Sequence, residues 1–295
     1  MEVTADVRRA IGGAMNRRDF LRWGAGALTV GTPIATVFYT FRIEPHWVEV
    51  VDHELAVDGL PSALAGANVV QISDLHIGPR VSDDYIIESL RRVASLRPDI
   101  LVITGDLISI GTPDPIGKLR GVLEHLPTGR LATVGILGNH DYGFAWREPA
   151  VANDVASALS DAGVRVLRNE RIDVGGLSIV GVDDLWALRA APASALAGIG
   201  RKPTIALCHN PDTLDEKSWA GYRGWVLAGH THGGQCKPPF LPPPLLPVRN
   251  KRYTSGEIAI ADGRRLYINR GLGHLLKVRF NVRPEITVHR LVPVQ

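Results

Sequence analysis

Five short polar clusters, each directly following an apolar run typical of a β-strand, constrain this chain more than any other feature. In order, the clusters are Asp74-Leu75-His76, Gly105-Asp106-Leu107, Gly138-Asn139-His140-Asp141, His209-Asn210-Pro211 and Gly229-His230-Thr231-His232-Gly233-Gly234. Because the carboxyl ends of neighbouring strands in an α/β sheet open onto one crevice, we expect the clusters to converge. Their glycines permit sharp turns and let the backbone approach a ligand.

The wider pattern of the chain predicts an α/β sandwich of two sheets flanked by helices. Helical patterns lie near residues 82–96, 115–125, 149–162 and 211–217. The expected strands are residues 47–57, 68–72, 100–104, 132–137, 177–182, 204–207, 225–227, 257–261, 266–268 and 285–290. Asp262-Gly263 reads as a hairpin turn between two of them. We see no repeat and no linker, so residues 45–295 are expected to form one domain.

The cluster residues are suited to binding transition metals. Asp74 and His76 are two positions apart on an extended segment and so point the same way, as do His230 and His232. Two Asp, one Asn and four His offer mixed oxygen and nitrogen ligands, which favour Mn, Fe or Zn over Ca or Mg. Seven ligands with one bridging carboxylate predict a site for two ions about 3.5–4 Å apart.

These motifs, in this order, resemble those of the calcineurin-like metallophosphoesterases, and the resemblance covers about residues 65–291. Ser-Asp-Leu-His-Ile-Gly, Gly-His-Thr-His-Gly-Gly-Gln, Asn-Arg-Gly-Leu-Gly (269–273) and Arg-Pro-Glu-Ile-Thr (283–287) look like the exported or membrane-anchored bacterial subgroup. The resemblance implies a four-layer α/β/β/α sandwich with two mixed sheets. It also implies a phosphodiesterase, or an enzyme like those that act on UDP-2,3-diacylglucosamine.

The resemblance also implies a role for each cluster residue. The first metal is bound by Asp74, His76 and His232, the second by Asn139, His209 and His230, and Asp106 bridges both. His140 lies over the substrate phosphate and protonates the leaving oxygen. Asp141 orients the His140 ring. A hydroxide bridging the two ions attacks phosphorus in line.

Other residues carry weaker expectations. Arg270 and Arg279 are suited either to holding a substrate phosphate or to a structural role. Two cysteines exclude a disulfide framework, and Cys208 and Cys236 are expected to be small fillers rather than ligands or a bridge. The five histidines outside the clusters are expected to be structural or on the surface; they are His46, His53, His125, His274 and His289.

Pro238–Pro247 cannot form regular helix or sheet, because proline interrupts both. We expect an extended loop. Its apolar side chains either form a lip beside the metals, useful for a lipid-bearing substrate or for contact with a membrane, or pack as an ordinary surface loop; they are Phe240, Leu241, Leu245 and Leu246.

Residues 1–44 are expected to lie outside the catalytic domain. Paired arginines at 17–18 precede Phe20-Leu21, and residues 23–41 carry no charge. As a helix that stretch would span roughly 28 Å, about the thickness of a bilayer core. It resembles a twin-arginine export signal, cleaved or kept as an anchor. The alternative is an amphipathic start to a cytosolic domain.

The charge balance bears on the partner. Residues 1–44 hold six Arg and four acids, so the remainder has 27 basic and 26 acidic residues and is nearly neutral. A nuclease is therefore disfavoured, and no nucleic-acid partner is expected. We expect an inner-membrane or periplasmic enzyme that is exported by the twin-arginine machinery and cleaves a phosphate ester, lipid-linked or not. A non-catalytic binding protein is the remaining alternative, although all seven ligands are present.

Overall fold

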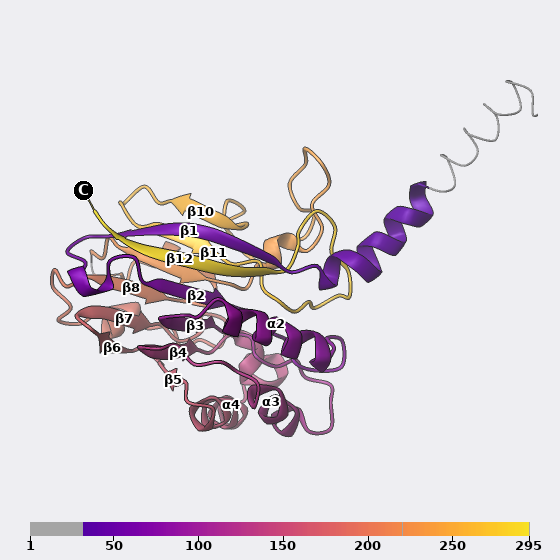
Figure 1. Ribbon diagram of the computed structural model, residues 1–295, viewed down its shortest axis with the longest axis horizontal. Helices are drawn as coiled ribbons and strands as arrows, with labels where there is room; N and C mark the ends of the chain where they lie inside the picture. Colours follow the sequence, from indigo (N-terminus) through magenta and orange to yellow (C-terminus); the bar gives the residue numbers. More distant parts are fainter. Residues whose placement is uncertain (1–31, 220, 295) are drawn as a thin grey trace, which may run out of the picture.

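Two mixed six-stranded sheets form the centre of the computed structural model, which describes residues 32–294 except 220 (Figure 1). The first sheet has the order β1 (Glu49–Val57), β12 (Glu285–Pro293), β2 (Asn68–Ile72), β3 (Ile100–Thr104), β4 (Ala132–Ile136), β5 (Arg165–Val166). The second has the order β10 (Gly256–Ala259), β11 (Arg265–Ile268), β9 (Trp225–Ala228), β8 (Thr204–Leu207), β7 (Leu177–Gly181), β6 (Glu170–Val174). Antiparallel pairing is confined to β12 with β2, β10 with β11 and β6 with β7.

Three hydrophobic layers hold the sheets together. Side chains such as Val102, Ile136 and Leu227 fill the space between the sheets. Helices α2 (Asp83–Ser95), α3 (Pro115–Leu123) and α4 (Pro149–Asp161) cover the outer face of the first sheet (Figure 1). The short α5 (Pro192–Ala195) and irregular segments cover the second sheet. This arrangement confirms the predicted sandwich, with a thinner outer layer over the second sheet.

Helix α2 shows how the sequence specifies these layers. Ile86, Leu90 and Val93 recur at helical spacing and are buried against the sheet. Asp83 and Asp84 in the first turn interact favourably with the positive end of the helix dipole.

The ten expected strands are all present, with ends shifted by up to three residues. The Asp262-Gly263 turn joins β10 to β11 as predicted. The expected helix at 211–217 is wrong: Pro211–Asp215 forms a 3₁₀ helix. The Asn210 side chain accepts a hydrogen bond from the Asp212 N–H. The Trp219 indole N–H donates to the Thr213 carbonyl, so this carbonyl is not used to extend the 3₁₀ helix into an α-helix.

The amino-terminal end of the described chain is helical over residues 32–38 and π-helical over Tyr39–Ile43, and it points away from the sheets (Figure 1). The Thr40 carbonyl accepts from the Arg279 N–H, and the buried Glu44 carboxylate accepts from the N–H groups of Asn281 and Val282. Within residues 32–219 and 221–294, no helix has both the length and the apolar character needed to cross a bilayer. The paired arginines and most of the uncharged stretch lie outside the described residues.

Candidate metal centre

The five polar clusters converge at the carboxyl ends of β2, β3 and β4 in one sheet and of β8 and β9 in the other. These strands are parallel neighbours within their sheets. Backbone bonds tie the first two loops together: Asp74 N–H donates to the Gly105 carbonyl at 2.9 Å, and His76 N–H donates to the Asp106 carbonyl at 3.0 Å.

A strained backbone holds the polar side chains of these loops in place. Five cluster residues have positive φ angles: Asp74 (52°), His76 (49°), Asp106 (56°), His230 (72°) and His232 (50°). Non-glycine residues rarely adopt this conformation, and such strain gathers at functional sites. The fit is tight, because a Cβ on Gly138 would lie 2.3 Å from an Asp106 carboxylate oxygen.

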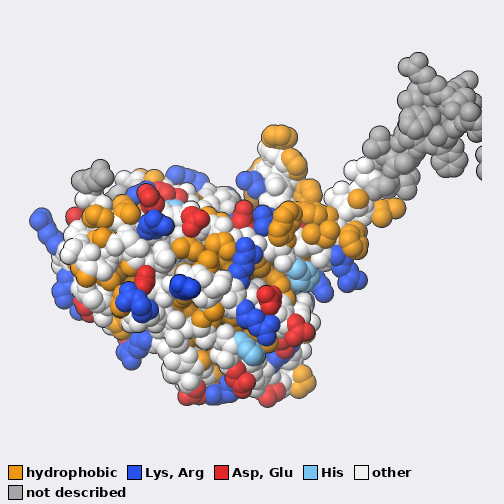
Figure 2. All heavy atoms as spheres, in the orientation of Figure 1, with side chains coloured by type: hydrophobic (Ala, Val, Ile, Leu, Met, Phe, Trp, Pro, Cys, Tyr) orange, Lys and Arg blue, Asp and Glu red, His pale blue; other side chains and the backbone are white. Residues whose placement is uncertain are grey.

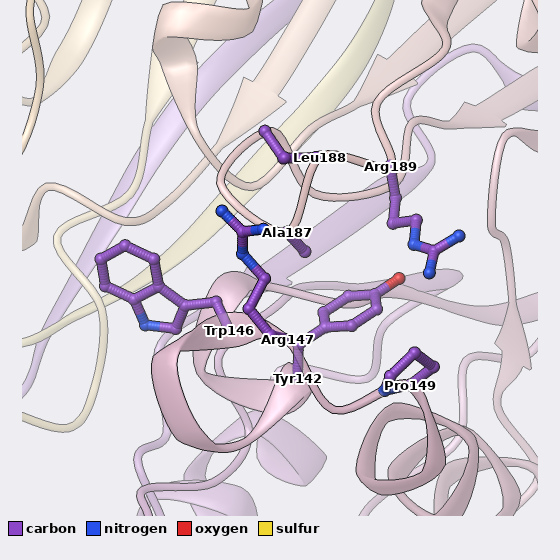
Figure 3. A pocket seen from close by; sticks show the side chains of 7 residues that line it. All are labelled: Tyr142, Trp146, Arg147, Pro149, Ala187, Leu188 and Arg189. Carbon is purple, nitrogen blue, oxygen red and sulfur yellow. The ribbon is translucent and has the colours of Figure 1, made fainter.

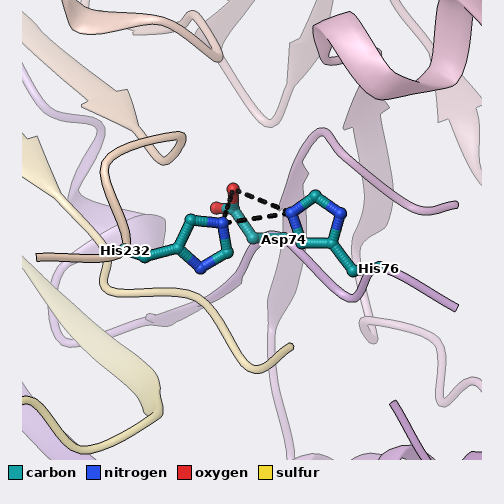
Figure 4. A group of neighbouring side chains, drawn as sticks. All are labelled: Asp74, His76 and His232. Atoms are coloured by element: carbon teal, nitrogen blue, oxygen red, sulfur yellow. Dashed lines mark hydrogen bonds and ion pairs between the residues drawn. The ribbon is translucent and has the colours of Figure 1, made fainter. Parts of the chain in front are cut away.

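One group of side chains consists of Asp74, His76 and His232 (Figure 4). The Asp74 Oδ1 lies 3.3 Å from His232 Nε2 and 3.9 Å from His76 Nε2. The two Nε2 atoms are 3.0 Å apart. All three residues are buried.

A second group consists of Asp106, His209 and His230. The Asp106 Oδ2 lies 3.1 Å from His209 Nε2, and His209 Nε2 lies 3.2 Å from His230 Nδ1. The same Oδ2 is 3.6 Å from His76 Nε2 in the first group. Asp106 therefore stands between the two groups, where a bridging carboxylate is needed.

The outer ring nitrogens of three histidines are held by the protein. His209 Nδ1 donates to the Thr104 carbonyl at 2.7 Å, and His230 Nε2 donates to the Pro247 carbonyl at 2.8 Å. His76 Nδ1 pairs with the Ser109 hydroxyl at 3.0 Å. These bonds point the inner nitrogens of His209 and His230 toward each other and toward the Asp106 carboxylate. Such an arrangement fits cations.

The electrostatics of the cluster point the same way. Burial lowers the pKa of His76 and of His230 to about 3, so both rings are neutral ligands. Burial would also lower the pKa of His209, but the Asp106 carboxylate raises it to about 10. Burial raises the pKa of Asp74 to about 6. Two buried carboxylates thus require positive charge beside them.

The third loop brings Asn139 and His140 to the same place. Asn139 is fully buried, and neither side-chain amide atom has a hydrogen-bond partner among the described residues, which is unusual unless a ligand is bound. The His140 backbone N–H donates to Asp106 Oδ1 at 2.9 Å, and its half-buried ring lies 4.9 Å from the His76 ring. His76, Asp106 and His140 form a third group that could hold an ion.

The structure shows what holds the Asp141 carboxylate. Its buried carboxylate accepts four backbone N–H groups, from Asp106, Leu107, Ile108 and Gly138, at 2.8–3.2 Å. No described hydrogen bond joins it to the His140 ring. Asp141 therefore fixes the loop of Asp106 to its own loop, and an orienting role toward His140 stays a prediction.

The two candidate phosphate-binding arginines are engaged elsewhere. Arg270 pairs with Glu285 and, at 2.8 Å, with Glu49. Arg279 is fully buried and donates to the carbonyls of Val282, Arg270, Gly271 and Gly273. These contacts favour structural roles for both arginines, and substrate binding by Arg270 stays a prediction.

Residues outside the motifs also line the centre. The Asp184 carboxyl is buried, burial raises its pKa to about 7, and its Oδ2 has no partner among the described residues. Asp184 follows β7 as the five clusters follow their strands, a signal that could have found it. The Trp186 ring meets the His230 ring edge-on at 4.4 Å and stacks on Trp146 at 4.6 Å. No sequence motif pointed to Trp146 or Trp186.

A cavity of about 180 Å³ lies beside these aromatic rings (Figure 3). It is lined by Tyr142, Trp146, Arg147, Pro149, Ala187, Leu188 and Arg189. It lies next to the His140 loop and provides room for part of a substrate.

The remaining candidates are the two cysteines and the proline-rich loop, which adjoins the cluster at Pro247. Both cysteines are free thiols, and Cys208 is buried, as expected of a filler. In the Pro238–Pro247 loop, Phe240, Leu241 and Leu245 are exposed and Leu246 is half-buried, while the Pro247 carbonyl contacts His230.

Comparison with known proteins identifies the family. Residues 67–234 match the model of the calcineurin-like phosphoesterases. The chain belongs to this family. Calcineurin-like phosphoesterases use divalent metals, and the two groups around Asp106 supply candidate ligands for them.

The relatives extend the likeness over nearly the whole chain. It is 33% identical to an uncharacterized metallophosphoesterase, YkuE, of Bacillus subtilis, over 94% of this chain and 98% of that one. It is 29% identical to phosphodiesterase YaeI of Escherichia coli, over 94% and 100%. It is 27% identical to the UDP-2,3-diacylglucosamine pyrophosphatase LpxG of Chlamydia muridarum, over 88% and 94%.

Proposed function

We propose that this protein is a two-metal phosphoesterase that hydrolyses a phosphodiester or a pyrophosphate-linked substrate. One observation carries the proposal: the carboxylate of Asp106 lies between two groups of buried ligands, within 3.1 Å of His209 and 3.6 Å of His76. Bound there, two divalent cations would lower the pKa of water and neutralise charge on a phosphoryl group.

The protein's own residues would supply the rest of the chemistry. Asp74, His76 and His232 would hold one ion, and Asn139, His209 and His230 the other, with Asp106 shared. The half-buried His140 is the most accessible imidazole of the cluster, so it would give a proton to the leaving oxygen. The strained loops keep these groups in place before substrate arrives, which avoids reorganisation during the reaction.

We further propose a lipid-linked substrate and a location outside the cytoplasm. The likeness to a phosphodiesterase and to a pyrophosphatase of an acylated nucleotide sugar supports a diester or pyrophosphate, and the second favours a lipid. Paired arginines before an uncharged stretch support export by the twin-arginine route, with residues 1–44 as signal or inner-membrane anchor. A nuclease or a non-catalytic protein has no comparable support.

Turnover by the full-length protein tests the proposal. We expect hydrolysis of bis(p-nitrophenyl) phosphate and of a UDP-linked acyl sugar with Mn, Fe, Zn or Co, and slower hydrolysis of the monoester. Asp106→Asn should reduce kcat by roughly 10³-fold, since it removes the charge shared by both ions. Asp173→Asn, at an exposed hairpin turn, is the matched control. A protein that binds no transition metal, with Asp106→Asn as active as wild type, would refute an enzymatic role.

A further inference from the structure

Exposed apolar side chains gather at one end of the molecule. Among the described residues, fifteen large hydrophobic side chains are exposed, and ten of them lie in residues 34–47, 240–245 and at 276. In Figure 2 they appear on the rising loop and along the helix that leads toward the grey atoms. We call residues 34–47, 237–252 and 276–277 the apolar end.

Hydrogen bonds join the three segments into one surface. The Arg279 N–H donates to the Thr40 carbonyl at 3.1 Å, and the Lys237 N–H donates to the Phe280 carbonyl at 2.9 Å. The Gln235 side chain donates to the Leu276 carbonyl at 2.8 Å. Helix, proline-rich loop and the 276–282 segment are therefore neighbours, although they are distant in the sequence.

The apolar groups are arranged to meet a partner. Ile34, Val37, Phe38 and Phe41 have the i, i+3, i+4, i+7 spacing of one helix face, yet that face is exposed. Phe240 is fully exposed and has φ of +65°, so the loop pays in strain to present it. Prolines on both sides already restrict the loop, so it loses little further conformational freedom on binding.

The charge of the apolar end identifies that partner. Six exposed cationic side chains surround the apolar groups: Arg42, Lys237, Arg249, Lys251, Arg252 and Lys277. The one acidic residue in these segments is Glu44, which is buried and bonded to backbone N–H groups. A second copy of this chain would bring like charges together. Exposed aliphatic and phenyl groups ringed by cations match the acyl and headgroup layers of an anionic membrane.

We propose that the apolar end binds the surface of an anionic lipid bilayer. The surface adjoins the metal centre, because the proline-rich loop ends at Pro247, whose carbonyl accepts from His230 at 2.8 Å. Resting on the proposed function, the consequence is that the substrate phosphate belongs to a lipid presented at the bilayer surface, and that the loop holds the protein against the membrane while the phosphate reaches the metals.

Vesicle binding tests the proposal without any need for turnover. Full-length protein is sedimented with phosphatidylcholine vesicles, with and without phosphatidylglycerol. We expect binding that requires phosphatidylglycerol and falls with salt. Arg249→Gln, Arg252→Gln and Lys277→Gln together should weaken it by about fivefold for each cation removed. Phe240→Ser with Leu241→Ser should weaken it by about tenfold.

Matched controls carry the same changes elsewhere on the surface. Leu131→Ser and Arg201→Gln with Lys202→Gln lie outside the apolar end and should bind as wild type does. A far-UV circular dichroism spectrum and a urea midpoint unchanged in every variant show that each is folded.

Several results would overturn the proposal. Binding to phosphatidylcholine alone, binding that the apolar-end variants leave intact, or a wild-type dimer that these variants dissociate would each do so. If the variants lose vesicle binding but turnover of a bilayer-embedded phosphodiester falls no more than turnover of a soluble one, the surface binds membrane but does not serve the substrate.

Discussion

Two of the imidazole pairs in the described part of this protein have the same distance between ring nitrogens but differ in what surrounds them. In the metal centre, His76 and His232 face each other with their Nε2 atoms 3.0 Å apart (Figure 4). At the edge between the sheets, His53 and His289 face each other with their Nδ1 atoms also 3.0 Å apart. The distances are equal, but the proton arrangements are not.

The pair between the sheets satisfies itself. Gln71 donates its amide hydrogens to Thr104 and Ala228, so its oxygen accepts from His289 Nε2 at 2.9 Å. His289 Nδ1 therefore accepts a hydrogen bond from the Nδ1–H of His53. In the metal centre, the outer nitrogen of His76 meets the Ser109 hydroxyl, whereas His232 Nδ1 has no partner among the described residues. The two inner nitrogens face each other and the Asp74 carboxylate. The two pairs therefore differ in the partners of their ring nitrogens and not in the distance between their rings.

The largest expected effect separates the pairs by function. His76→Ala removes an inner nitrogen of the pair in the metal centre and should reduce kcat for bis(p-nitrophenyl) phosphate by roughly 10³-fold, since several kcal/mol of metal assistance is lost. His53→Ala alters the other pair and should leave kcat unchanged. Steady-state kinetics with saturating metal measures both.

The free energy of unfolding of His53→Ala completes this test. His53 contacts Trp225, Tyr267 and Glu257, so His53→Ala should lower the free energy of unfolding by about 1 kcal/mol. If His53→Ala impairs turnover as strongly as His76→Ala, the two pairs do not differ in the way the hydrogen bonds indicate.

Local pattern predicted most of the fold and the convergence of the five polar clusters. An apolar run followed by Gly, Asp or His is readable in sequence, because strand, turn and side chain lie within a few residues. The sequence did not predict strands β5 and β6, because they are short, polar edge strands: Glu170–Val174 is largely exposed. The 3₁₀ turn after His209 depends on one capping side chain and one distant indole.

Side-chain roles that depend on distant partners were not readable. Asp141 binds backbone groups of a loop more than thirty residues earlier, and no spacing rule connects the two. Arg270 meets Glu49 only because β1 and β12 pair. The left-handed backbone of the ligands likewise reflects loops closed by tertiary contacts.

A smaller effect should follow from removing an outer bond in the metal centre. Ser109→Ala deletes the hydroxyl that holds His76 Nδ1, and the ring loses its fixed orientation. Metal affinity should fall by about tenfold, in line with the loss of other groups that support a metal-binding histidine. Titration with a competing chelator measures this.

The control for Ser109→Ala is Ser160→Ala, which removes an exposed hydroxyl on α4. Metal affinity should not change there. Supplying excess metal should restore the turnover of Ser109→Ala, whereas a variant that stays inactive at saturating metal would show that Ser109 does more than orient His76.

The smallest effect concerns pH and the pair between the sheets. Burial lowers the pKa of His289 well below its ordinary value, so the folded protein keeps this ring neutral. Below about pH 6.5 the unfolded chain binds a proton at His289 that the folded chain does not, so the free energy of unfolding falls by up to about 1.4 kcal/mol per pH unit. His289→Gln lacks this contribution.

Urea unfolding between about pH 5 and 7.5 measures it. The gap in the free energy of unfolding between wild type and His289→Gln should narrow as the pH falls. Ser160→Ala removes an exposed hydroxyl and no titratable group, so it should show a gap that does not change with pH. A constant gap for His289→Gln as well would mean that the folded protein accepts the proton, and that the pair between the sheets is as open to positive charge as the metal centre.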